Sequence, residues 1–594
     1  MLRKYYPVVL VIGFVMTAFS GWRMYDLFMD QDLWGHLPLF LFVGLFIFIV
    51  GLVFRKKRRH VHHRRWLALS MISAALLSLG FPPFPTTFTI LIGFVPLFFI
   101  EREVMKDEQV KNPFGTLALY GYITFVLWNI LTTYWVANTA LVAGVVAILA
   151  NALLMLVPWM TFIVFRYFVG DRTAYFTFIA FWISFEYLHM QWEITWPWLT
   201  LGNALAEYAW LPQWYSFTGV FGGSLWILMS NIFFFEILRR KMEGRLSGRR
   251  QLALGLWISV PVVISIWMYQ SYEPKGEKVE VAIIQPNFEP HYEKFNMSSR
   301  ERMDTLVSLT KRALTPSTHY LLYPETVFNS VNVEQVAESY EVNIIREVIS
   351  AYPSLFWVSG ISGYRIFPRF IPNRPNLRTS VRGDETVYWE AYNAAFQSTS
   401  NLQDVQVYFK SKLVPGPEIF PYKKQLSFLK PLIEKLDGTI EGLGTQSDRA
   451  VFVSNRFAIA PVICYESIFG EYCNGYVQNG AQALFIMTND GWWDDTPGHI
   501  QHLKFGRLRA IESRRDIARS ANTGISCFID QKGRIKQATR YDEAIAINGD
   551  IMMNESKTFY VKWGDSIGRL SLFVSFFQLL YIIFGILKKR MKIL

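Results

Sequence analysis

Long apolar runs separated by short polar stretches fill the first half of the chain. Their cores lie at residues 8–22, 37–54, 66–79, 88–100, 114–136, 140–168, 174–190, 215–238 and 252–269, and a last run lies at 570–587. A helix needs about 20 apolar residues to cross the roughly 30 Å hydrocarbon core of a bilayer. The pattern therefore predicts ten transmembrane helices, of which the shorter runs are the weaker candidates.

From residue 278 the pattern changes to short alternating runs that are typical of β-strands. Strands are predicted at 278–285, 320–324, 356–362, 391–396, 457–464, 483–489, 525–530 and 544–550. Helices are predicted between some of them, at 299–313, 334–351 and 499–519. Mixed strands and helices in one continuous stretch indicate a single α/β domain.

The two patterns divide the chain into three parts. Residues 1–275 are predicted to form a transmembrane helical domain of about nine spans, and residues 276–555 an α/β catalytic domain. Residues 556–594 are predicted to hold a linker, a C-terminal transmembrane helix and a basic tail.

Composition agrees with a membrane protein. Hydrophobic residues make up 52% of the chain and charged residues only 18%, which is low for a soluble protein of this size. The net charge of +12 lies in short clusters between apolar runs. A nucleic-acid-binding surface would instead concentrate its basic residues on a polar domain, so nucleic acid is excluded as a partner.

The positive charges also predict an orientation. Lys and Arg occur seven times in residues 55–65, six times in 239–251 and four times after Leu587, and such clusters face the cytoplasm. Both ends of the chain are then cytoplasmic, and the α/β domain lies on the opposite side of the membrane. The first run could instead be a cleaved signal peptide ending near Ala18-Phe19-Ser20, which leaves the predicted side unchanged.

Two stretches among the apolar runs cannot continue an ordinary helix. Residues 81–85 contain three prolines, and residues 192–203 are rich in aromatics and contain Pro197. One interpretation is an interfacial belt of aromatic residues with a turn. The other is irregular backbone that lines a cavity open to lipid or substrate, where such backbone is tolerated at membrane depth.

Three predicted strand ends carry chemically active side chains, which is where active sites of α/β domains tend to lie. Glu325 follows one strand, Lys410 and Lys412 precede a proline-bounded turn, and Cys464 ends an apolar run. A thiol with an ordinary pKa near about 8.5 needs a base or a cation beside it to attack at neutral pH. A carboxylate can take its proton and an ammonium can stabilise an oxyanion, so the three together predict acyl transfer through a thioester.

The chain holds three cysteines, Cys464, Cys473 and Cys527. The odd number leaves at least one unpaired, and whether Cys473 pairs with Cys527 stays open. No Cys-x-x-Cys or Cys/His spacing indicates zinc, so neither a metal nor another cofactor is predicted.

The order of these motifs resembles the apolipoprotein N-acyltransferase family of the nitrilase superfamily. YPET around Glu325, YFKSKLVP around Lys410 and VICYES around Cys464 are similar to its Glu-Lys-Cys triad. Further similar motifs lie at residues 81–84, 197–202, 488–495, 499–512 and 519–524. The resemblance implies an αββα sandwich on the periplasmic side of a multi-pass protein of the bacterial inner membrane.

The resemblance also implies residue roles. Glu325 would be the general base, Lys410 the cation that stabilises the oxyanion, and Cys464 the nucleophile that accepts the acyl group. Five further residues would support the triad. Glu418 and Glu466 would orient Lys410 or tune proton transfer, and Asn393 would belong to the same supporting set. Tyr465 and Trp492 would shape the acyl or phospholipid pocket. Tyr465 and Trp492 could equally be buried packing aromatics.

The implied reaction moves a fatty acyl chain from a membrane phospholipid to Cys464, and then to the α-amino group of the lipid-modified N-terminal cysteine of an apolipoprotein. The partners would be the phospholipid donor, the diacylglyceryl-modified apolipoprotein and the bilayer, and the enzyme would act as a monomer. A membrane-tethered amidase or nitrilase is the first alternative. A transporter or structural membrane protein is the second.

The sequence departs from the family pattern at several places. Residues 413–418 read LVPGPE where the family has Leu-Val-Pro-Phe-Gly-Glu, so Glu418 could be displaced. Lys412 is an alternative catalytic lysine, and Lys410 is preferred because of its spacing before LVP. A tryptophan expected soon after the first strand is missing, with Phe295 nearby, and two N-terminal spans exceed the family's usual number.

Overall fold

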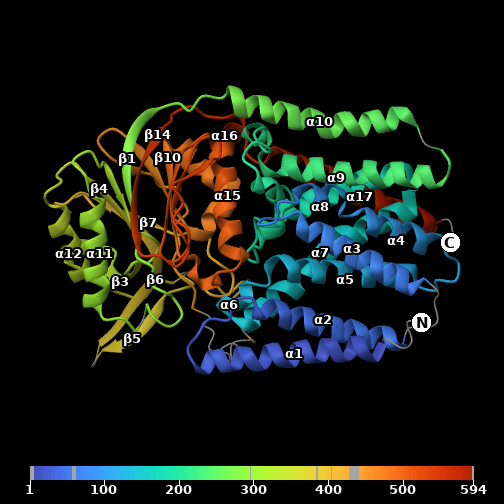
Figure 1. The fold of residues 1–594 in the computed structure, drawn as a ribbon, viewed down its shortest axis with the longest axis horizontal. Helices are drawn as coiled ribbons and strands as arrows, with labels where there is room; N and C mark the ends of the chain where they lie inside the picture. Colours follow the sequence, from blue (N-terminus) through green and yellow to red (C-terminus); the bar gives the residue numbers. More distant parts are fainter. Residues whose placement is uncertain are drawn as a thin grey trace.

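The structure is a computed structural model. It describes residues 6–56, 62–169, 171–245, 247–294, 296–372, 374–382, 385–402, 404–426, 428 and 441–591. Within these residues the chain forms a bundle of long helices joined end to end with an α/β part, as Figure 1 shows.

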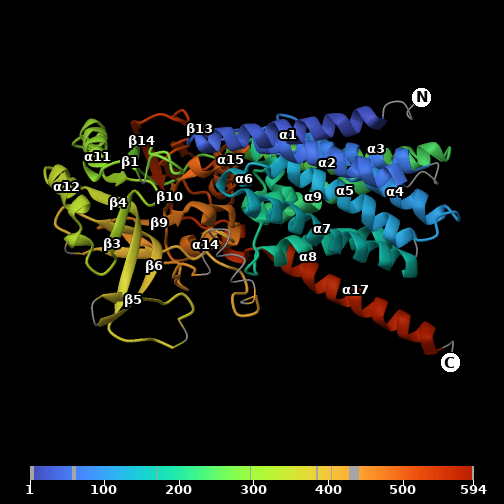
Figure 2. The ribbon, with the colours of Figure 1, turned by 90° about the horizontal axis from the view of Figure 1, so that it is seen from below.

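The bundle consists of helices from the first half of the chain and one from its end. They are α1 (Tyr6–Met29), α2 (Leu37–Lys56), α3 (His63–Leu79), α4 (Val95–Lys106), α5 (Pro113–Thr133), α6 (Val136–Thr139), α7 (Leu141–Val169), α8 (Asp171–His189), α9 (Tyr215–Met242), α10 (Gly248–Ser271) and α17 (Ser566–Met591). Most of the long helices run side by side away from the sheets, while α17 leaves the bundle at an angle (Figure 2). Six of the described helices are long and apolar enough to cross a membrane: α1, α5, α7, α9, α10 and the 566–584 part of α17. The chain is a multi-pass membrane protein.

The apolar run at 88–100 differs from its prediction as a spanning helix. It is divided into the 3-10 helix η1 (Thr87–Ile92) and the first turns of α4, which has only 12 residues. A helix of 12 residues is about 18 Å long, too short for a bilayer core of about 30 Å. At the junction of the two helices Gly93 packs closely against Leu77, where an added Cβ would lie 2.6 Å from a leucine methyl group.

The two proline-broken stretches form irregular backbone, and the second, residues 192–203, is mostly buried. The second contains the short 3-10 helices η2 (Pro197–Leu199) and η3 (Leu201–Glu207). Trp198 is fully buried there, and its indole N–H donates to Gln501 of the α/β part at 2.6 Å. The same Gln501 side chain donates to the Pro82 carbonyl at 2.9 Å. Both stretches therefore lie where the bundle meets the α/β part.

The α/β part contains two sheets. The first has the order β14-β1-β2-β4-β6-β5, with β3 on β4 and β7 on β6. The second has the order β13-β12-β11-β10-β9-β8. The strands of the first sheet are β1 (Glu277–Gln285), β2 (Tyr320–Leu322), β3 (Phe328–Asn332), β4 (Phe356–Phe367), β5 (Arg378–Arg382), β6 (Glu385–Ser398), β7 (Gln406–Phe409) and β14 (Ile545–Met553). Those of the second are β8 (Phe452–Val453), β9 (Ala458–Ile463), β10 (Ala483–Thr488), β11 (Ile517–Ala521), β12 (Cys527–Ile529) and β13 (Ile535–Lys536).

Alternate residues of β1 belong to two different cores because both faces of its sheet are covered. Val281 and Ile283 pack in the core shared with the second sheet, whereas Ala282 and Ile284 pack with α11 (Ser299–Ala313) and α12 (Tyr340–Ile349). The helices α14 (Gly470–Gln478) and α15 (Pro497–Ser513) lie on the side of the second sheet that faces the bundle, where Figure 1 labels α15 and Figure 2 labels α14. This is the predicted four-layer αββα sandwich, and the predicted fold class is confirmed.

All eight predicted strands are present, with shifted ends, but two predicted helices differ. The helix predicted at 499–519 ends at Ser513, because Arg514 adopts a left-handed backbone (φ +52°). The chain then enters the fully buried strand β11, which the sequence analysis missed. The helix predicted at 334–351 begins only at Tyr340.

Candidate active site

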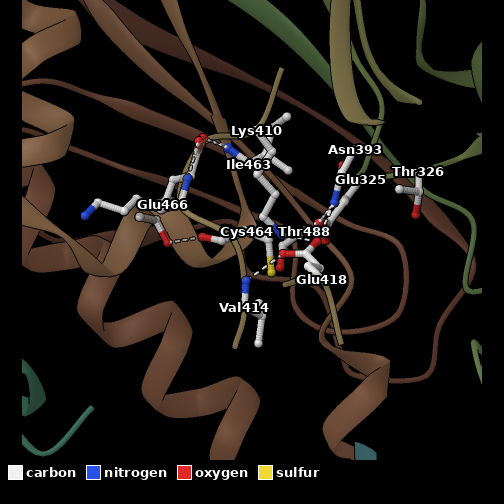
Figure 3. A network of polar contacts seen from close by, with 12 residues as sticks. Glu325, Thr326, Asn393, Lys410, Val414, Glu418, Ile463, Cys464, Glu466 and Thr488 are labelled. Atoms are coloured by element: carbon white, nitrogen blue, oxygen red, sulfur yellow. Dashed lines mark hydrogen bonds and ion pairs between the residues drawn. The ribbon is translucent and has the colours of Figure 1, made fainter. Parts of the chain in front are cut away.

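Glu325, Lys410 and Cys464 come from three strand ends that meet at one place. Lys410 directly follows β7 and Cys464 directly follows β9, while Glu325 lies in the turn after β2. Their side chains converge in Figure 3. The side chains of Lys410 and Glu325 are 1% and 7% exposed, and Cys464 is buried. The fold therefore brings together the three residues that the sequence singled out.

The lysine ammonium lies between two carboxylates. Lys410 Nζ donates to Glu325 Oε1 at 3.1 Å and to Glu418 Oε1 at 2.8 Å. The Asn393 amide donates to the same two oxygen atoms, at 2.7 Å and 3.0 Å. Two donors thus hold the Glu325 and Glu418 carboxylates at fixed positions beside the thiol (Figure 3).

Glu418 reaches this position despite the altered turn. Its second oxygen accepts a hydrogen bond from the Val414 N–H at 2.8 Å, so the 413–418 turn closes on its own glutamate. Gly416 has a φ of +99°, a conformation that glycine adopts readily. The LVPGPE sequence therefore brings Glu418 to Lys410 by a glycine turn.

Gly360 of β4 leaves the space in which the Glu325 turn lies. A Cβ at position 360 would meet the Pro324 carbonyl oxygen at 2.6 Å and Glu325 Cα at 2.7 Å. Both are backbone atoms, which cannot rotate away. Glu325 is thus positioned by close backbone packing as well as by hydrogen bonds.

Cys464 occupies an uncommon backbone conformation. Its φ is +46°, in the left-handed region that non-glycine residues seldom adopt, and it begins the 3-10 helix η6 (Cys464–Ile468). Burial raises the pKa of its thiol well above the ordinary value, and the Glu325 carboxylate raises this pKa further. Lys410 and a hydrogen bond with Thr488 act in the opposite direction. The resting residue is consequently a neutral thiol that must lose its proton to react.

Two neighbouring carboxylates keep Lys410 positively charged. Burial by itself would lower the pKa of its ammonium, but Glu325 and Glu418 outweigh burial and raise that pKa well above the usual value. Lys410 therefore stays a cation throughout the physiological pH range. A fixed cation beside a neutral thiol and a carboxylate can stabilise a developing oxyanion without giving up a proton.

Lys412 lies apart from this cluster. Its Nζ donates to the Met190 carbonyl at 3.0 Å and lies 4.9 Å from the Phe469 ring centroid. Its contacts thus join the α/β part to the end of α8. Of the two candidate lysines, Lys410 is the one in contact with Glu325.

The Glu466 carboxylate contacts the backbone beside Lys410 and Cys464. Its oxygens accept hydrogen bonds from the Tyr408 hydroxyl at 2.6 Å, from Ser411 N at 2.8 Å and from Ile463 N at 2.9 Å. These groups flank Lys410 and Cys464 along the backbone. Glu466 therefore fixes the two strand ends relative to each other, whereas the sequence analysis expected it to act on the Lys410 side chain or on proton transfer.

The two predicted aromatics contact different segments. Tyr465 is buried, and its hydroxyl donates to the Thr195 carbonyl at 2.9 Å, in the irregular stretch of the bundle. The half-buried ring of Trp492 packs edge-on against His291, with ring centroids 5.2 Å apart. Tyr465 thus ties the residue after Cys464 to the helix bundle.

A second buried hydrogen-bond network lies next to the Cys464 backbone. The sequence analysis assigned no role to its residues. Asp490 accepts hydrogen bonds from Thr488 at 2.6 Å, from His502 at 2.9 Å and from Arg519 at 2.5 Å. The other ring nitrogen of His502 lies 3.2 Å from the Cys464 carbonyl oxygen. The sequence motifs at 488–495, 499–512 and 519–524 contain these residues. Their spacing does not indicate which side chains contact one another in the fold.

Lys294 is a further buried cation near Glu325 that the sequence analysis missed. Its Nζ donates to the Thr326 carbonyl at 2.8 Å and to the Thr326 hydroxyl at 3.0 Å. Burial lowers the pKa of Lys294 to about 8, against the raising effect of Glu325. The neighbouring Phe295, noted where the family has a tryptophan, lies outside the described residues.

The described residues contain neither a cluster of metal ligands nor a disulfide. Among the described residues no group of three or more His, Cys, Asp and Glu side chains could hold a metal ion. Cys464, Cys473 and Cys527 are all buried free thiols, so Cys473 does not pair with Cys527 in this structure.

Two family models match the chain, one in the helix bundle and one in the α/β part. Residues 73–233 match the model of the apolipoprotein N-acyltransferase N-terminal domain, and residues 281–555 match that of carbon-nitrogen hydrolase. A protein of Chlorobaculum tepidum named apolipoprotein N-acyltransferase is 27% identical over 515 residues, covering 85% of this chain and 94% of that protein. One of Thermotoga maritima with the same name is 26% identical over 550 residues, covering 86% and 94%.

Among solved structures, a cysteine-to-alanine mutant of the Nesterenkonia AN1 amidase from the nitrilase superfamily is similar, with 15% identity and a TM-score of 0.33. The match covers 50% of this chain and 98% of the amidase. The two family models follow each other along one chain, and the named relatives align over most of its length. The chain belongs to the apolipoprotein N-acyltransferase family.

Proposed function

We propose that the protein transfers a fatty acyl group from a membrane phospholipid, by way of a thioester on Cys464, to the α-amino group of a lipid-modified N-terminal cysteine of an apolipoprotein. The convergence of Cys464, Glu325 and Lys410 in one buried cluster carries the proposal. The names of the relatives supply the class of acceptor.

In the first half-reaction the thiol attacks the ester carbonyl of the phospholipid. Glu325 takes the Cys464 proton as the S–C bond forms, and Lys410 stabilises the oxyanion of the tetrahedral intermediate. The ester C–O bond then breaks, and Glu325 returns the proton to the leaving alkoxide. The products are a lysophospholipid and an acyl thioester on Cys464.

In the second half-reaction the amine of the acceptor attacks the thioester. The C–N bond forms while Glu325 takes a proton from the nitrogen, and the S–C bond breaks. The proton on Glu325 passes to the departing thiolate, which restores the neutral thiol. Because the resting thiol has a raised pKa, it readily takes this proton back.

The supporting residues keep this geometry. Asn393 and Glu418 hold the Lys410 ammonium and the Glu325 carboxylate in contact. Glu466 holds the backbone on both sides of the site. Tyr465 keeps the nucleophile beside the bundle, and Trp492 would border the acyl chain or the lipid headgroup.

The orientation belongs to the same proposal. The connection between α9 and α10 lies at the end of the bundle remote from the sheets (Figure 1), and so does the last part of α17 (Figure 2). Basic residues are frequent at both places, in 239–251 and after Leu587. By the positive-inside rule that end faces the cytoplasm. The α/β part then lies on the periplasmic side of the inner membrane, where its substrates would reach it from the outer leaflet.

The test uses the purified full chain with a phospholipid of known acyl mass and a diacylglyceryl lipopeptide. With phospholipid alone, the intact mass of the protein should increase by one acyl group, and hydroxylamine should remove it. Addition of the lipopeptide should yield N-acylated peptide. Release of free fatty acid without N-acylated peptide would identify a hydrolase instead, and Cys464→Ala should abolish the mass increment.

A further inference from the structure

The connection between α1 and α2 reaches into the α/β part. The Gly35 N–H donates to Asp494 Oδ2 at 2.7 Å. Asp494 belongs to the loop after β10, residues 489–496, which includes the 3-10 helix η7 (Asp490–Trp493). The α1–α2 hairpin ends before residue 73, where the match to the N-terminal family model begins. A segment outside that match is therefore bonded to a loop next to the nucleophile.

A second set of contacts joins the same two segments. The Asn138 amide donates to the Gly35 carbonyl at 3.1 Å and to the Trp493 carbonyl at 3.1 Å. The neighbouring Thr139 hydroxyl donates to the Trp492 carbonyl at 3.2 Å. The helix α6 thus lies between the α1–α2 connection and the 489–496 loop and is bonded to both.

The backbone of Asp494 is strained. Its φ of +57° and ψ of −175° lie in a region that is essentially reserved for glycine. Such conformations persist only where the surroundings hold them. Here the Asp494 carboxylate does so, because Oδ1 accepts from the N–H of Asp495 at 2.6 Å and Oδ2 accepts from Gly35. The bond to Gly35 gives a reason for an aspartate where the backbone would favour glycine.

The loop is connected to Cys464 through two neighbouring residues. Directly before the loop, Thr488 ends β10, its hydroxyl donates to Asp490 of the loop at 2.6 Å, and it lowers the pKa of the Cys464 thiol. Further along, the Trp493 ring packs edge-on against His502, with ring centroids 5.4 Å apart, and His502 lies 3.2 Å from the Cys464 carbonyl oxygen. A displaced loop would consequently move both groups that contact Cys464.

We propose that Asp494 is a positioning residue through which the α1–α2 hairpin holds the 489–496 loop against Cys464. The inference rests on the proposed function only in assigning Cys464 as the nucleophile. The hairpin is then part of the machinery that fixes the reactive thiol, in addition to being a membrane anchor.

Asp494→Gly tests this inference sharply. Glycine suits the backbone conformation of position 494. If Asp494 serves only to form the turn, Asp494→Gly should therefore have unchanged or improved thermal stability and unchanged activity. If the bond to Gly35 positions the loop, the variant should instead lose roughly tenfold in kcat for N-acyl transfer with little change in KM. Asp494→Asn keeps an oxygen that can accept from Gly35 and should retain most of the activity.

Alkylation of Cys464 by iodoacetamide, followed by peptide mass spectrometry on the full chain, provides a readout that needs no substrate. Asp494→Gly should change the rate of Cys464 alkylation by at least about threefold, because a displaced loop shifts the groups around the thiol. Asp495→Asn is the matched control, since the Asp495 side chain is 73% exposed, and it should leave the rate unchanged.

The two proposals fail in different ways. Absence of N-acyl product from the unaltered protein would contradict the proposed function, while the alkylation assay would still test the positioning. Should Asp494→Gly fold poorly, Asn138→Ala removes the second set of contacts and should reproduce the change in alkylation. Wild-type alkylation and turnover in folded Asp494→Gly, or in folded Asn138→Ala where Asp494→Gly is not folded, would overturn the inference.

Discussion

Lys410 Nζ lies 3.1 Å from Glu325 Oε1, and both side chains are almost completely buried. A buried ion pair costs desolvation energy and survives only with further hydrogen bonds, which Asn393 and Glu418 supply here. If Lys410 serves the proposed acyl transfer, its removal has a direct effect on the rate.

Lys410→Met is expected to reduce N-acyl transfer by at least roughly 10²- to 10³-fold, because the cation that stabilises the oxyanion is lost. Lys412→Met is the matched control, since Lys412 contacts the Met190 carbonyl instead of Glu325. It should keep activity within a few-fold of wild type. The measurement is the initial rate of lipopeptide acylation, and equal losses in both variants would contradict the assignment of Lys410.

Glu325→Gln should separate thiol ionisation from catalysis. Glu325 raises the pKa of Cys464, so its neutral replacement should lower that pKa and speed alkylation of Cys464 by iodoacetamide at pH near 8. Acyl transfer should nevertheless fall by roughly 10²- to 10⁴-fold, because the base is gone. Slower alkylation together with retained transfer would show that another group takes the thiol proton.

Alkylation of Cys464 in the unaltered protein should increase with pH without reaching a plateau below about pH 9. The reason is that burial and Glu325 raise the thiol pKa well above its ordinary value, so the thiolate fraction is still growing there. Peptide mass spectrometry gives the rate at each pH. Cys473 and Cys527 serve as internal controls that should react more slowly, because they are 2% and 0% exposed whereas Cys464 is 7% exposed.

Asp490→Asn should destabilise the protein by about 3–5 kcal/mol, because it leaves the buried Arg519 guanidinium without its counter-charge. Arg519 and His502 outweigh burial and lower the pKa of Asp490, so its contribution to stability is present above the unfolded pKa of about 3.9 and is lost as the pH falls through the lower folded pKa. Thermal unfolding at pH 7 is the measurement. A Tm equal to that of Asp495→Asn would contradict it.

Gly360→Ala should impair both folding and activity. The added methyl group would meet backbone atoms of Pro324 and Glu325 at 2.6–2.7 Å, and overpacking of this kind costs about 1–3 kcal/mol. The displaced Glu325 should lower kcat more than KM rises. Gly255→Ala in α10 meets no atom within 4 Å and should be neutral in both Tm and turnover.

The apolar pattern located eight of the described strands, among them β1, β2, β9 and β10, which are mostly or fully buried. It did not locate the short or more exposed strands β3, β5, β7, β8 and β13. It missed β11, since Arg519 and Ser520 make that segment look polar although all of it is buried. The charge of Arg519 is satisfied by Asp490, 29 residues earlier, and such a pairing exists only after folding.

At the site, residue types at strand ends and the motif resemblance located Glu325, Lys410 and Cys464. The sequence could not assign Glu466, because two residues of separation from Cys464 do not indicate that its carboxylate faces the Tyr408 hydroxyl and the Ser411 N–H. The sequence analysis did not identify Lys294 as a site residue, for a related reason. Its burial depends on the loop after β1 closing over Thr326, a contact between segments about thirty residues apart.

The bond from Tyr465 to the Thr195 carbonyl, together with Gln501 between Trp198 and Pro82, leaves little freedom between the two halves of the molecule. These contacts fix the position of the Cys464 sulfur relative to the helix bundle. We therefore expect the flexible chains of the lipid substrates to move toward the sulfur during the reaction, while the α/β part and the bundle keep their relative placement.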